Sequence, residues 1–288
     1  MLRPLRVYQP MSISEASAEL ARLGEEAKVY AGGTELIILL RLGLVPCTHL
    51  VDVKRVPELG ALTWDGKVMH IGGAVTHRRL ERDADVAAHL PLLQRATEFV
   101  ANVRVRNVGT LGGNLCFGDS HSDRAPVLLV YGTRVKIGKR SGGRTIGLEQ
   151  FFKGPCETAL ASDELLIELE VTPLLPGMGS AYLRAARFER PSIGVAVAAA
   201  HSDGRFTDVR LAVSCVGPVP IRLHELESRL QGATLADGQQ IVGQAQRHYQ
   251  EVLQPVDDLH GSAAYKTYLT GVLLGRGLAQ SIAANERN

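Results

Sequence analysis

Cysteine is scarce in this sequence, and its spacing excludes a self-contained metal site. The chain has four cysteines with no C-x-x-C pair among them: Cys47, Cys116, Cys156 and Cys215. Zinc ribbons and iron–sulfur sites need clustered cysteine ligands. We therefore predict that this chain binds no metal and that its cysteines are reduced core or loop residues. Cys116 is noted because it lies just past a glycine-rich segment.

Long hydrophobic runs are also missing. The longest aliphatic run, residues 36–40, is too short to cross a bilayer. Residues 1–6 lack the apolar core of a signal peptide. A net charge of +2 gives no reason to expect nucleic acid or a membrane surface as a partner. We predict a cytoplasmic protein with no nucleic-acid partner and no integral membrane segment.

The common nucleotide-binding signatures are absent. The sequence has neither G-x-G-x-x-G nor G-K-[ST] after its glycine turns, so neither a Rossmann site nor a P-loop is supported. No repeat of about 20–50 residues and no low-complexity segment is visible. No His, Asp and Glu side chains form a convincing acid–base group, so we predict no catalytic residue in this chain.

The chain is long enough for two domains. It has 288 residues, of which 45% are hydrophobic and 22% charged, as in an ordinary globular protein. After a predicted strand at 164–171, Pro173 and Pro176-Gly177 interrupt the pattern, and we place the domain boundary between residues 176 and 177. Because the interruption is short, we expect the two parts to pack on each other.

The first glycine segment joins a predicted strand at 28–30 to a predicted helix at 35–42. It reads Ala31-Gly32-Gly33-Thr34. Unpaired N–H groups at the start of a helix favour a phosphate, and Thr34 suits the N-cap. Glu35 counts against this interpretation, because its carboxylate competes for the same positive end. Alone, the segment is a weak signal.

The second glycine segment runs from Arg106 to Leu115 and contains Gly109-Thr110-Leu111-Gly112-Gly113-Asn114. Successive N–H groups in a glycine turn can hold an anion, and Thr110 and Asn114 add polar side chains. Asp123 could accept hydrogen bonds from sugar hydroxyls. Two ordinary glycine turns that join strands would produce the same pattern, so this segment alone leaves both interpretations open.

Three other patterns predict local structure. Val and Arg alternate over residues 103–106, which favours a strand over a phosphate-facing pair of arginines. His77 follows the N-cap candidate Thr76 and is interpreted as a surface or capping residue. An apolar stripe predicts that a C-terminal helix docks through Tyr265, Tyr268, Leu269, Val272 and Leu273. Further helices are predicted at 13–23, 91–100, 125–131 and 221–230, and further strands at 49–53, 62–71, 134–146, 194–200 and 209–213.

Together the segments resemble a known family. Residues 31–35, Ile71-Gly72-Gly73-Ala74, residues 106–114 and Ser122-Asp123 before Ala125-Pro126 resemble the FAD-binding (medium) subunit of molybdenum hydroxylases of the carbon monoxide dehydrogenase and xanthine dehydrogenase type. Residues 261–273 are similar to the end of those subunits. The resemblance runs nearly end to end, and the pair of glycine segments at this separation is its specific part.

The resemblance implies an α+β fold. Residues 1–176 would form an FAD-binding domain of the PCMH type, with subdomains at about 1–56 and 57–176. Residues 177–288 would form a smaller C-terminal domain of the carbon monoxide dehydrogenase flavoprotein type, with a three-stranded antiparallel sheet and helices.

The resemblance also implies a cofactor site. The two segments would hold the FAD diphosphate, Asp123 would bind ribityl or ribose hydroxyls, and Leu166 would touch the flavin. Tyr182 and Arg184 fall where the family often has an aromatic residue and a lysine beside the isoalloxazine. Residues 116–118 and His121 depart from the family's small residues and proline. The implied FAD-binding residues are Ala31, Gly32, Gly33, Thr34, Glu35, Thr110, Leu111, Gly112, Gly113, Asn114, Asp123, Leu166, Tyr182 and Arg184.

Three functions follow as hypotheses. The leading one is an electron-transfer flavoprotein subunit of a molybdenum hydroxylase, in a dimer of heterotrimers with a molybdenum cofactor-binding large subunit and a [2Fe–2S] small subunit. The second is a stand-alone FAD-dependent oxidase or dehydrogenase that shares this FAD domain, and the third is a non-enzymatic nucleotide-binding protein. The leading hypothesis requires residues 31–35 and 110–114 to meet in space.

Overall fold

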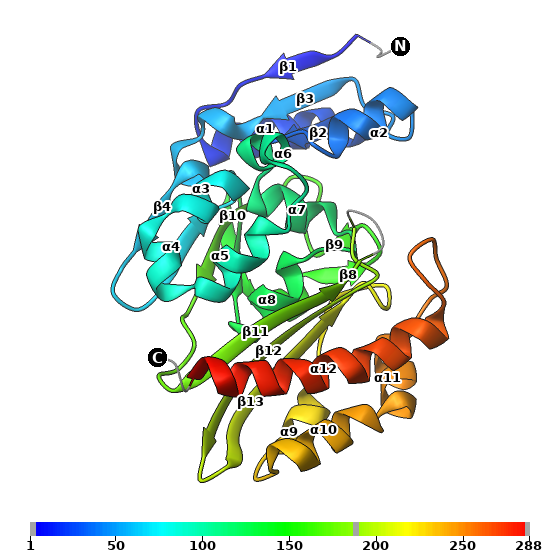
Figure 1. Cartoon of the computed structure of the whole chain (residues 1–288). Coiled ribbons are helices and arrows are strands. Elements are labelled where there is room, and N and C mark those ends of the chain that lie inside the picture. The colour runs from blue at the N-terminus through cyan, green and yellow to red at the C-terminus, as the bar shows by residue number, and fades with distance from the viewer. Residues whose placement is uncertain (1–3, 187–189, 286–288) are drawn as a thin grey trace.

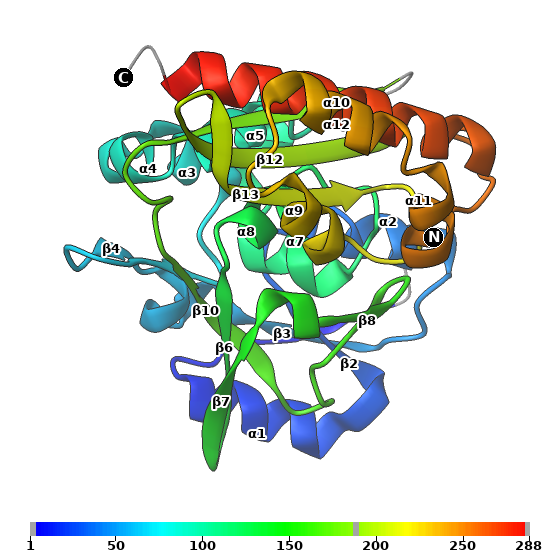
Figure 2. The ribbon, with the colours of Figure 1, turned by 90° about the horizontal axis from the view of Figure 1, so that it is seen from below.

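The computed structural model describes residues 4–186 and 190–285. It has an N-terminal unit, a middle unit and a C-terminal unit, each built on a β-sheet (Figures 1 and 2). Within the described ranges, none of the helices combines the length and apolar character that a membrane span requires.

The N-terminal unit is a parallel sheet of order β1-β3-β2. Helix α1 starts at the N-cap Ser12, whose hydroxyl accepts a hydrogen bond from the Glu15 N–H, as the capping pattern predicts. The elements are β1 (Arg6–Tyr8), α1 (Ile13–Leu23), η1 (Gly24–Glu26), β2 (Ala27–Tyr30), α2 (Leu36–Leu42), β3 (His49–Asp52), η2 (Val53–Arg55) and η3 (Pro57–Gly60).

The middle unit is an antiparallel sheet of order β4-β5-β10-β6-β7 that packs against helices. The predicted Asp-Gly hairpin joins β4 to β5. The strands are β4 (Leu62–Trp64), β5 (Met69–Gly72), β6 (Arg134–Lys139), β7 (Gly142–Gly147) and β10 (Leu165–Val171), with a small β8 (Phe152–Gly154) and β9 (Glu157–Thr158) pair. The helices are α3 (His77–Arg82), α4 (Ala84–His89), α5 (Pro91–Glu98), α6 (Val103–Val108), α7 (Leu111–Phe117), α8 (Arg124–Val130) and the short η4 (Leu148–Gln150).

The strand prediction for residues 103–106 is wrong, because this stretch is helix α6. The Asn102 side chain caps the helix by accepting hydrogen bonds from the N–H groups of Arg104 and Val105. Arg106 turns inward and donates to Glu81 and to the Val100 carbonyl. A local cap therefore decides the structure against the Val and Arg alternation.

The C-terminal unit is an antiparallel sheet of order β11-β12-β13-β14. The prediction of three strands is corrected to four, because Ile221–Arg222 pairs with β13 before helix α9 begins at His224. The elements are β11 (Met178–Ala185), β12 (Ile193–Ser202), β13 (Arg205–Ser214), β14 (Ile221–Arg222), α9 (His224–Leu230), α10 (Leu235–Gly243), α11 (Gln246–Leu253) and α12 (Ala263–Asn285).

Strand β12 belongs to two apolar clusters, one shared with the middle unit and one within the C-terminal unit. Its Ala196 and Ala198 belong to the apolar cluster that includes helix α8, while Val195 and Val197 belong to the cluster that includes α12. Alternate residues of a strand face opposite sides of the sheet, so β12 is covered on both faces. Figure 1 shows α12 lying along the sheet of β11, β12 and β13. The expected packing of the two parts is therefore present.

Helix α12 docks through only part of the predicted stripe: Leu273 is buried and Leu269 packs against the same apolar cluster, but the two tyrosines do not. Tyr265 and Tyr268 are 49% and 61% exposed, whereas Lys266, Thr270 and Leu274 are fully buried. Small residues decide the docking: a Cβ on Gly277 would lie 2.6 Å from Val197 Cγ2.

Candidate functional site

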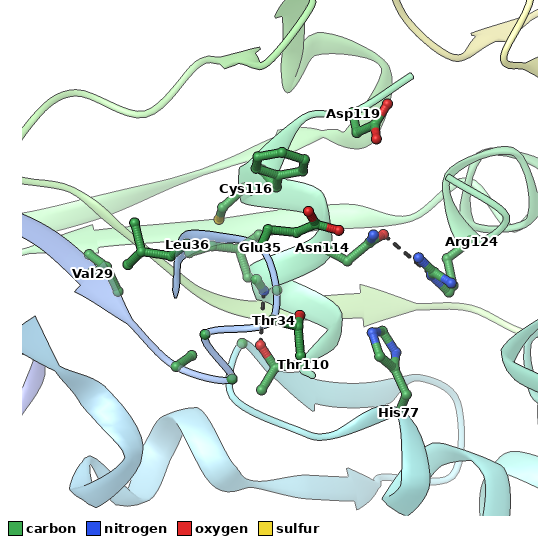
Figure 3. A pocket seen from close by; sticks show the side chains of 18 of the residues that line it. Val29, Thr34, Glu35, Leu36, His77, Thr110, Asn114, Cys116, Asp119 and Arg124 are labelled. Atoms are coloured by element: carbon green, nitrogen blue, oxygen red, sulfur yellow. Dashed lines mark hydrogen bonds between the residues drawn. The ribbon is translucent and has the colours of Figure 1, made fainter. Parts of the chain in front are cut away.

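A cavity of about 700 Å³ lies between the N-terminal and middle units (Figure 3). This volume is typical of a pocket for a small molecule or cofactor. The predicted site residues that line it are Ala31, Gly32, Gly33, Thr34, Glu35, Thr110, Gly112, Gly113, Asn114, Asp123 and Leu166. Leu111, Tyr182 and Arg184 do not line it.

The two glycine segments meet at the cavity wall. A Cβ on Gly32 would lie 2.2 Å from the Val108 carbonyl oxygen and 2.7 Å from Gly109 Cα. Thr34 Cγ2 is 3.6 Å from the corresponding position on Gly109. Glycine at position 32 thus permits backbone-to-backbone contact that any side chain would block. The central prediction, that these segments converge, is met.

The first segment keeps its backbone donors unpaired. Within the described chain, the N–H groups of Gly32, Gly33, Thr34 and Glu35 donate no hydrogen bond. The N-cap of α2 is Glu35 rather than the predicted Thr34, and its side chain does not cap the helix. Four neighbouring N–H groups at the wall of a cavity form a place for an anion.

The second segment uses its backbone donors within the chain. Thr110 is the N-cap of helix α7, and its Oγ1 accepts from the Gly113 N–H at 3.0 Å. The N–H groups of Leu111 and Gly112 donate to the carbonyls of Val75 and Gly73 at 3.0 and 3.1 Å. A Cβ on Gly112 would lie 2.4 Å from the Gly73 oxygen. These glycines therefore shape the wall, and the interpretation of this segment as an amide cradle is not supported.

Asn114 and Asp123 bring side chains to the cavity. The Asn114 Oδ1 accepts hydrogen bonds from the Ser122 hydroxyl at 2.8 Å and from Arg124 Nε at 3.3 Å. Its amide nitrogen is left to donate elsewhere. Burial raises the pKa of Asp123, against the opposing charge of Arg124.

Tyr182 and Arg184, which do not line the cavity, both contact the Asp123 carboxylate. The Tyr182 hydroxyl donates to Asp123 Oδ1 at 2.6 Å, and Arg184 Nη1 lies 3.5 Å from the same oxygen. Burial, followed by the charge of Asp123, raises the pKa of Tyr182 well above its usual value, so the phenol stays a donor. The Arg184 guanidinium also lies 5.5 Å from the centre of the Phe99 ring, and Phe99 lines the cavity. Tyr182 and Arg184 are thus connected to the cavity through lining residues: both contact Asp123, and Arg184 also contacts Phe99.

Two buried polar residues of the cavity were missed from the sequence. His77, interpreted as a surface or capping residue, is only 3% exposed, and its Nδ1 has no hydrogen-bond partner in the described chain. Burial and then the charges of Arg124 and Arg106 lower the pKa of His77 well below its usual value. Arg124 is 5% exposed. Figure 3 shows the His77 ring pointing toward the Arg124 guanidinium. The sequence holds no local signal for either placement.

Charged side chains that line the cavity pair with one another. Arg190 contacts Asp119 and lies 3.1 Å from Glu35 Oε1, so it joins helix α7's end, the first glycine segment and the C-terminal unit. Although burial acts to raise it, hydrogen bonds from His121 and the charge of Arg190 lower the pKa of Asp119 to about 2. His121 also lies 3.2 Å from Asp258. The Glu35 carboxylate is therefore paired with a cation, which weakens the objection to an anion there.

The residues present fit FAD. Unpaired amides, a contact between segments that any Cβ would block, and a buried histidine nitrogen without a partner suit a phosphate-containing ligand. In the described ranges, no three His, Cys, Asp or Glu side chains are placed to hold a metal ion. The cavity therefore offers hydrogen-bond donors and apolar walls rather than metal ligands.

Comparisons with known proteins agree with this geometry. Residues 3–173 match the family described as "FAD binding domain in molybdopterin dehydrogenase", and residues 177–281 match "CO dehydrogenase flavoprotein C-terminal domain". The chain is 31% identical to the carbon monoxide dehydrogenase medium chain of Hydrogenophaga pseudoflava, over 94% of each chain. It is 31% identical to the xanthine dehydrogenase FAD-binding subunit of Escherichia coli O157:H7, over 90% of each.

A solved structure extends the likeness to three dimensions. The carbon monoxide dehydrogenase of Hydrogenophaga pseudoflava, in a form that lacks the Mo-pyranopterin moiety of the molybdenum cofactor, matches with a TM-score of 0.93. The sequence identity is 30%, and the match covers 99% of both chains. The α+β architecture described above is therefore shared across the whole length.

Proposed function

We propose a function from one premise: the chain belongs to the family of FAD-binding subunits of molybdenum hydroxylases, as its motifs predicted. FAD is the cofactor of this family's domain, and the chain is an FAD-dependent oxidoreductase subunit. We infer that it takes electrons from a [2Fe–2S] partner subunit and passes them to an external acceptor.

One observation carries the proposal. Residues 31–35 and 108–113 meet at one wall of the cavity, and the first of these segments presents four unpaired N–H groups there. When bound, FAD supplies the electron-accepting and electron-donating chemistry. The chain supplies its position and electrostatic surroundings, which needs no acid–base pair.

Each predicted residue has a proposed role. Ala31 to Glu35 bind the diphosphate through backbone groups, while Thr110 to Gly113, including the buried Leu111, support the wall beside them. Asn114 and Asp123 hydrogen-bond to hydroxyls, and Leu166 packs against the flavin. Tyr182 and Arg184 fix Asp123. The same proposal divides the chain at residues 176 and 177, with subdomains at about 1–56 and 57–176.

The partners follow from the family. Relatives are named as medium chains of carbon monoxide dehydrogenase and as the FAD-binding subunit of xanthine dehydrogenase, which supports a multi-subunit enzyme. We propose a large subunit with the molybdenum cofactor and a small subunit with [2Fe–2S] clusters, assembled as a dimer of heterotrimers. The cytoplasmic location stays a prediction.

Flavin content tests the proposal. We expect the purified chain or its complex to be yellow, or to become so with added FAD, with one FAD per chain by absorbance after denaturation. A denatured, filtered sample should release the flavin, whereas flavin kept on the chain would favour the stand-alone oxidase. A colourless protein that ignores added FAD would remove the proposal.

Electron transfer needs its own measurement. The intact complex, reduced anaerobically with dithionite, is mixed with NAD, a quinone or oxygen while the iron–sulfur and flavin absorbances are followed. We expect an acceptor to reoxidise the flavin and the clusters together in the FAD-loaded complex and to leave the clusters reduced after FAD is stripped. Equal reoxidation without FAD would overturn the proposed electron route.

A further inference from the structure

We propose that Arg124 and His77 form an anion-binding floor of the cavity, which holds the diphosphate of FAD together with the unpaired amides of residues 32–35. This inference rests on the proposed function and adds two residues to its site. Neither residue belongs to a glycine segment.

Arg124 is a buried cation without a matching anion. Its side chain is 5% exposed, and its one hydrogen bond to the described residues joins Nε to Asn114 Oδ1 at 3.3 Å. No carboxylate of the described residues lies within 4.0 Å of its guanidinium nitrogens. The neighbouring Asp123 instead directs Oδ1 to Tyr182 and Arg184. A buried charge is costly unless it is paired, so an anionic ligand is the partner that this arrangement lacks.

The other cations that line the cavity are placed differently. Lys28 is exposed, and Arg190 is 46% exposed and already paired with Glu35 and Asp119. Among the described residues of the lining, Arg124 is thus the buried positive charge that remains for a ligand. A guanidinium binds phosphate oxygens well because its N–H groups point outward in one plane.

His77 supplies a second donor beside it. Its Nδ1 is buried without a partner, and both burial and the nearby arginines disfavour the charged ring. A neutral imidazole carries one N–H, and after a half-turn of the ring about its Cβ–Cγ bond Nδ1 can donate that proton to a phosphate oxygen. A ligand acceptor would remove the cost of an unpaired buried group.

Position identifies the diphosphate as the target. The His77 backbone N–H donates to the Gly109 carbonyl at 3.0 Å, and a Cβ on Gly109 would lie 3.6 Å from Thr34 Cγ2 of the first segment. Figure 3 shows His77 and Arg124 beside Asn114, Thr110 and Thr34. The two side chains therefore lie next to the point where the segments meet, where the diphosphate is proposed to bind.

Binding by the apo protein tests the inference. FAD affinity is measured by titration, and ADP, which carries the diphosphate without the flavin, is measured as its competitor. We expect Arg124→Met to weaken FAD and ADP by the same factor, about tenfold or more, because a charge-assisted hydrogen bond is lost. Arg124→Lys should lose less, and His77→Phe should weaken both ligands about threefold to tenfold. Arg104→Met removes an equal charge from the exposed face of α6 and should change neither affinity.

The outcomes separate the two proposals. A wild-type chain that does not bind FAD sinks the proposed function. A wild-type chain that binds FAD, with Arg124→Met binding FAD and ADP equally well, overturns this inference alone. If Arg124→Met weakens FAD but leaves ADP unchanged, Arg124 faces the flavin ring and the diphosphate assignment is wrong. Should Arg124→Met fail to fold by circular dichroism, Arg124→Lys and His77→Phe carry the same comparison of FAD with ADP.

Discussion

The two glycine segments of the cavity are similar in sequence and differ in their backbone hydrogen bonds. In residues 31–35, the N–H groups from Gly32 to Glu35 have no partner within the described chain. In residues 110–114, the N–H groups from Leu111 to Asn114 donate to Val75, Gly73 and Thr110. The first segment can therefore bind an anion directly, whereas the second supports the wall on which the anion would rest.

The difference teaches that a glycine pair is not by itself an anion cradle. Glycine is required in both segments for close approach, at Gly32 against Val108 and at Gly112 against Gly73. Free donors remain only where no carbonyl from elsewhere reaches the turn. For Leu111 and Gly112, those carbonyls come from the segment at 73–75, whereas Gly113 and Asn114 donate to Thr110.

The largest expected effect is on ligand binding by the first segment. In Gly32→Ala, the new Cβ must move away from the Val108 oxygen, which would lie 2.2 Å away. We expect the segments to separate and the affinity for FAD to fall about a hundredfold, which corresponds to about two lost charge-assisted hydrogen bonds. Titration of the apo protein with FAD measures this.

Gly60→Ala is the matched control for this substitution. A Cβ at Gly60 meets nothing within 4 Å, and its φ is not in the left-handed region. Its FAD affinity should equal that of the wild type. If Gly32→Ala binds FAD as tightly as Gly60→Ala, the first segment does not hold the diphosphate.

The next prediction tests whether the second segment supports the cavity wall rather than binding the ligand directly. Gly112→Ala places a Cβ 2.4 Å from the oxygen of Gly73, which is itself packed against Leu166. We expect the apo protein to lose about 2–3 kcal/mol of unfolding free energy from overpacking, measured by urea denaturation. Its folded fraction should lose less FAD affinity than Gly32→Ala does. A stable Gly112→Ala protein that no longer binds FAD would contradict the division between the segments.

Sequence reasoning predicted part of this site and missed the rest for identifiable reasons. The family resemblance implied the convergence of the glycine segments and a place for Asp123 in the site. Sequence reasoning failed where groups distant in the sequence determine the structure. It did not predict that Gly73 and Val75 accept hydrogen bonds from the second segment, or that His77 and Arg124 are buried. In the fold, most strands and helices were predicted, but the cap at Asn102 and the pairing of Ile221 with β13 overrode the local pattern.

A smaller effect is expected from the cap of the second segment. Thr110→Val removes the oxygen that accepts from the Gly113 N–H at 3.0 Å. We expect the apo protein to lose about 1 kcal/mol of unfolding free energy, the usual value of an N-cap. Thr110→Ser keeps the oxygen and should remain near the wild type. If Thr110→Ser loses stability and Thr110→Val does not, the Thr110 methyl group rather than the cap stabilises this turn.

The smallest expected effect is a change in how the unfolding free energy depends on pH, and it tests whether His77 is neutral in the folded protein. Its pKa in the folded protein lies below the value of about 6.5 in the unfolded chain, so the unfolded state binds more protons as the pH falls through 6.5. His77 therefore lowers the unfolding free energy of the apo protein toward acid. We expect His77→Phe to lose less stability than the wild type between pH 7.5 and 5.5, as measured by urea denaturation. The pKa of His70 is raised, mainly by its hydrogen bond to Glu168, so His70 increases the unfolding free energy toward acid. Because both proteins contain His70, its contribution cancels in the comparison. Equal pH slopes in the two proteins would show that His77 is not held neutral at the cavity floor.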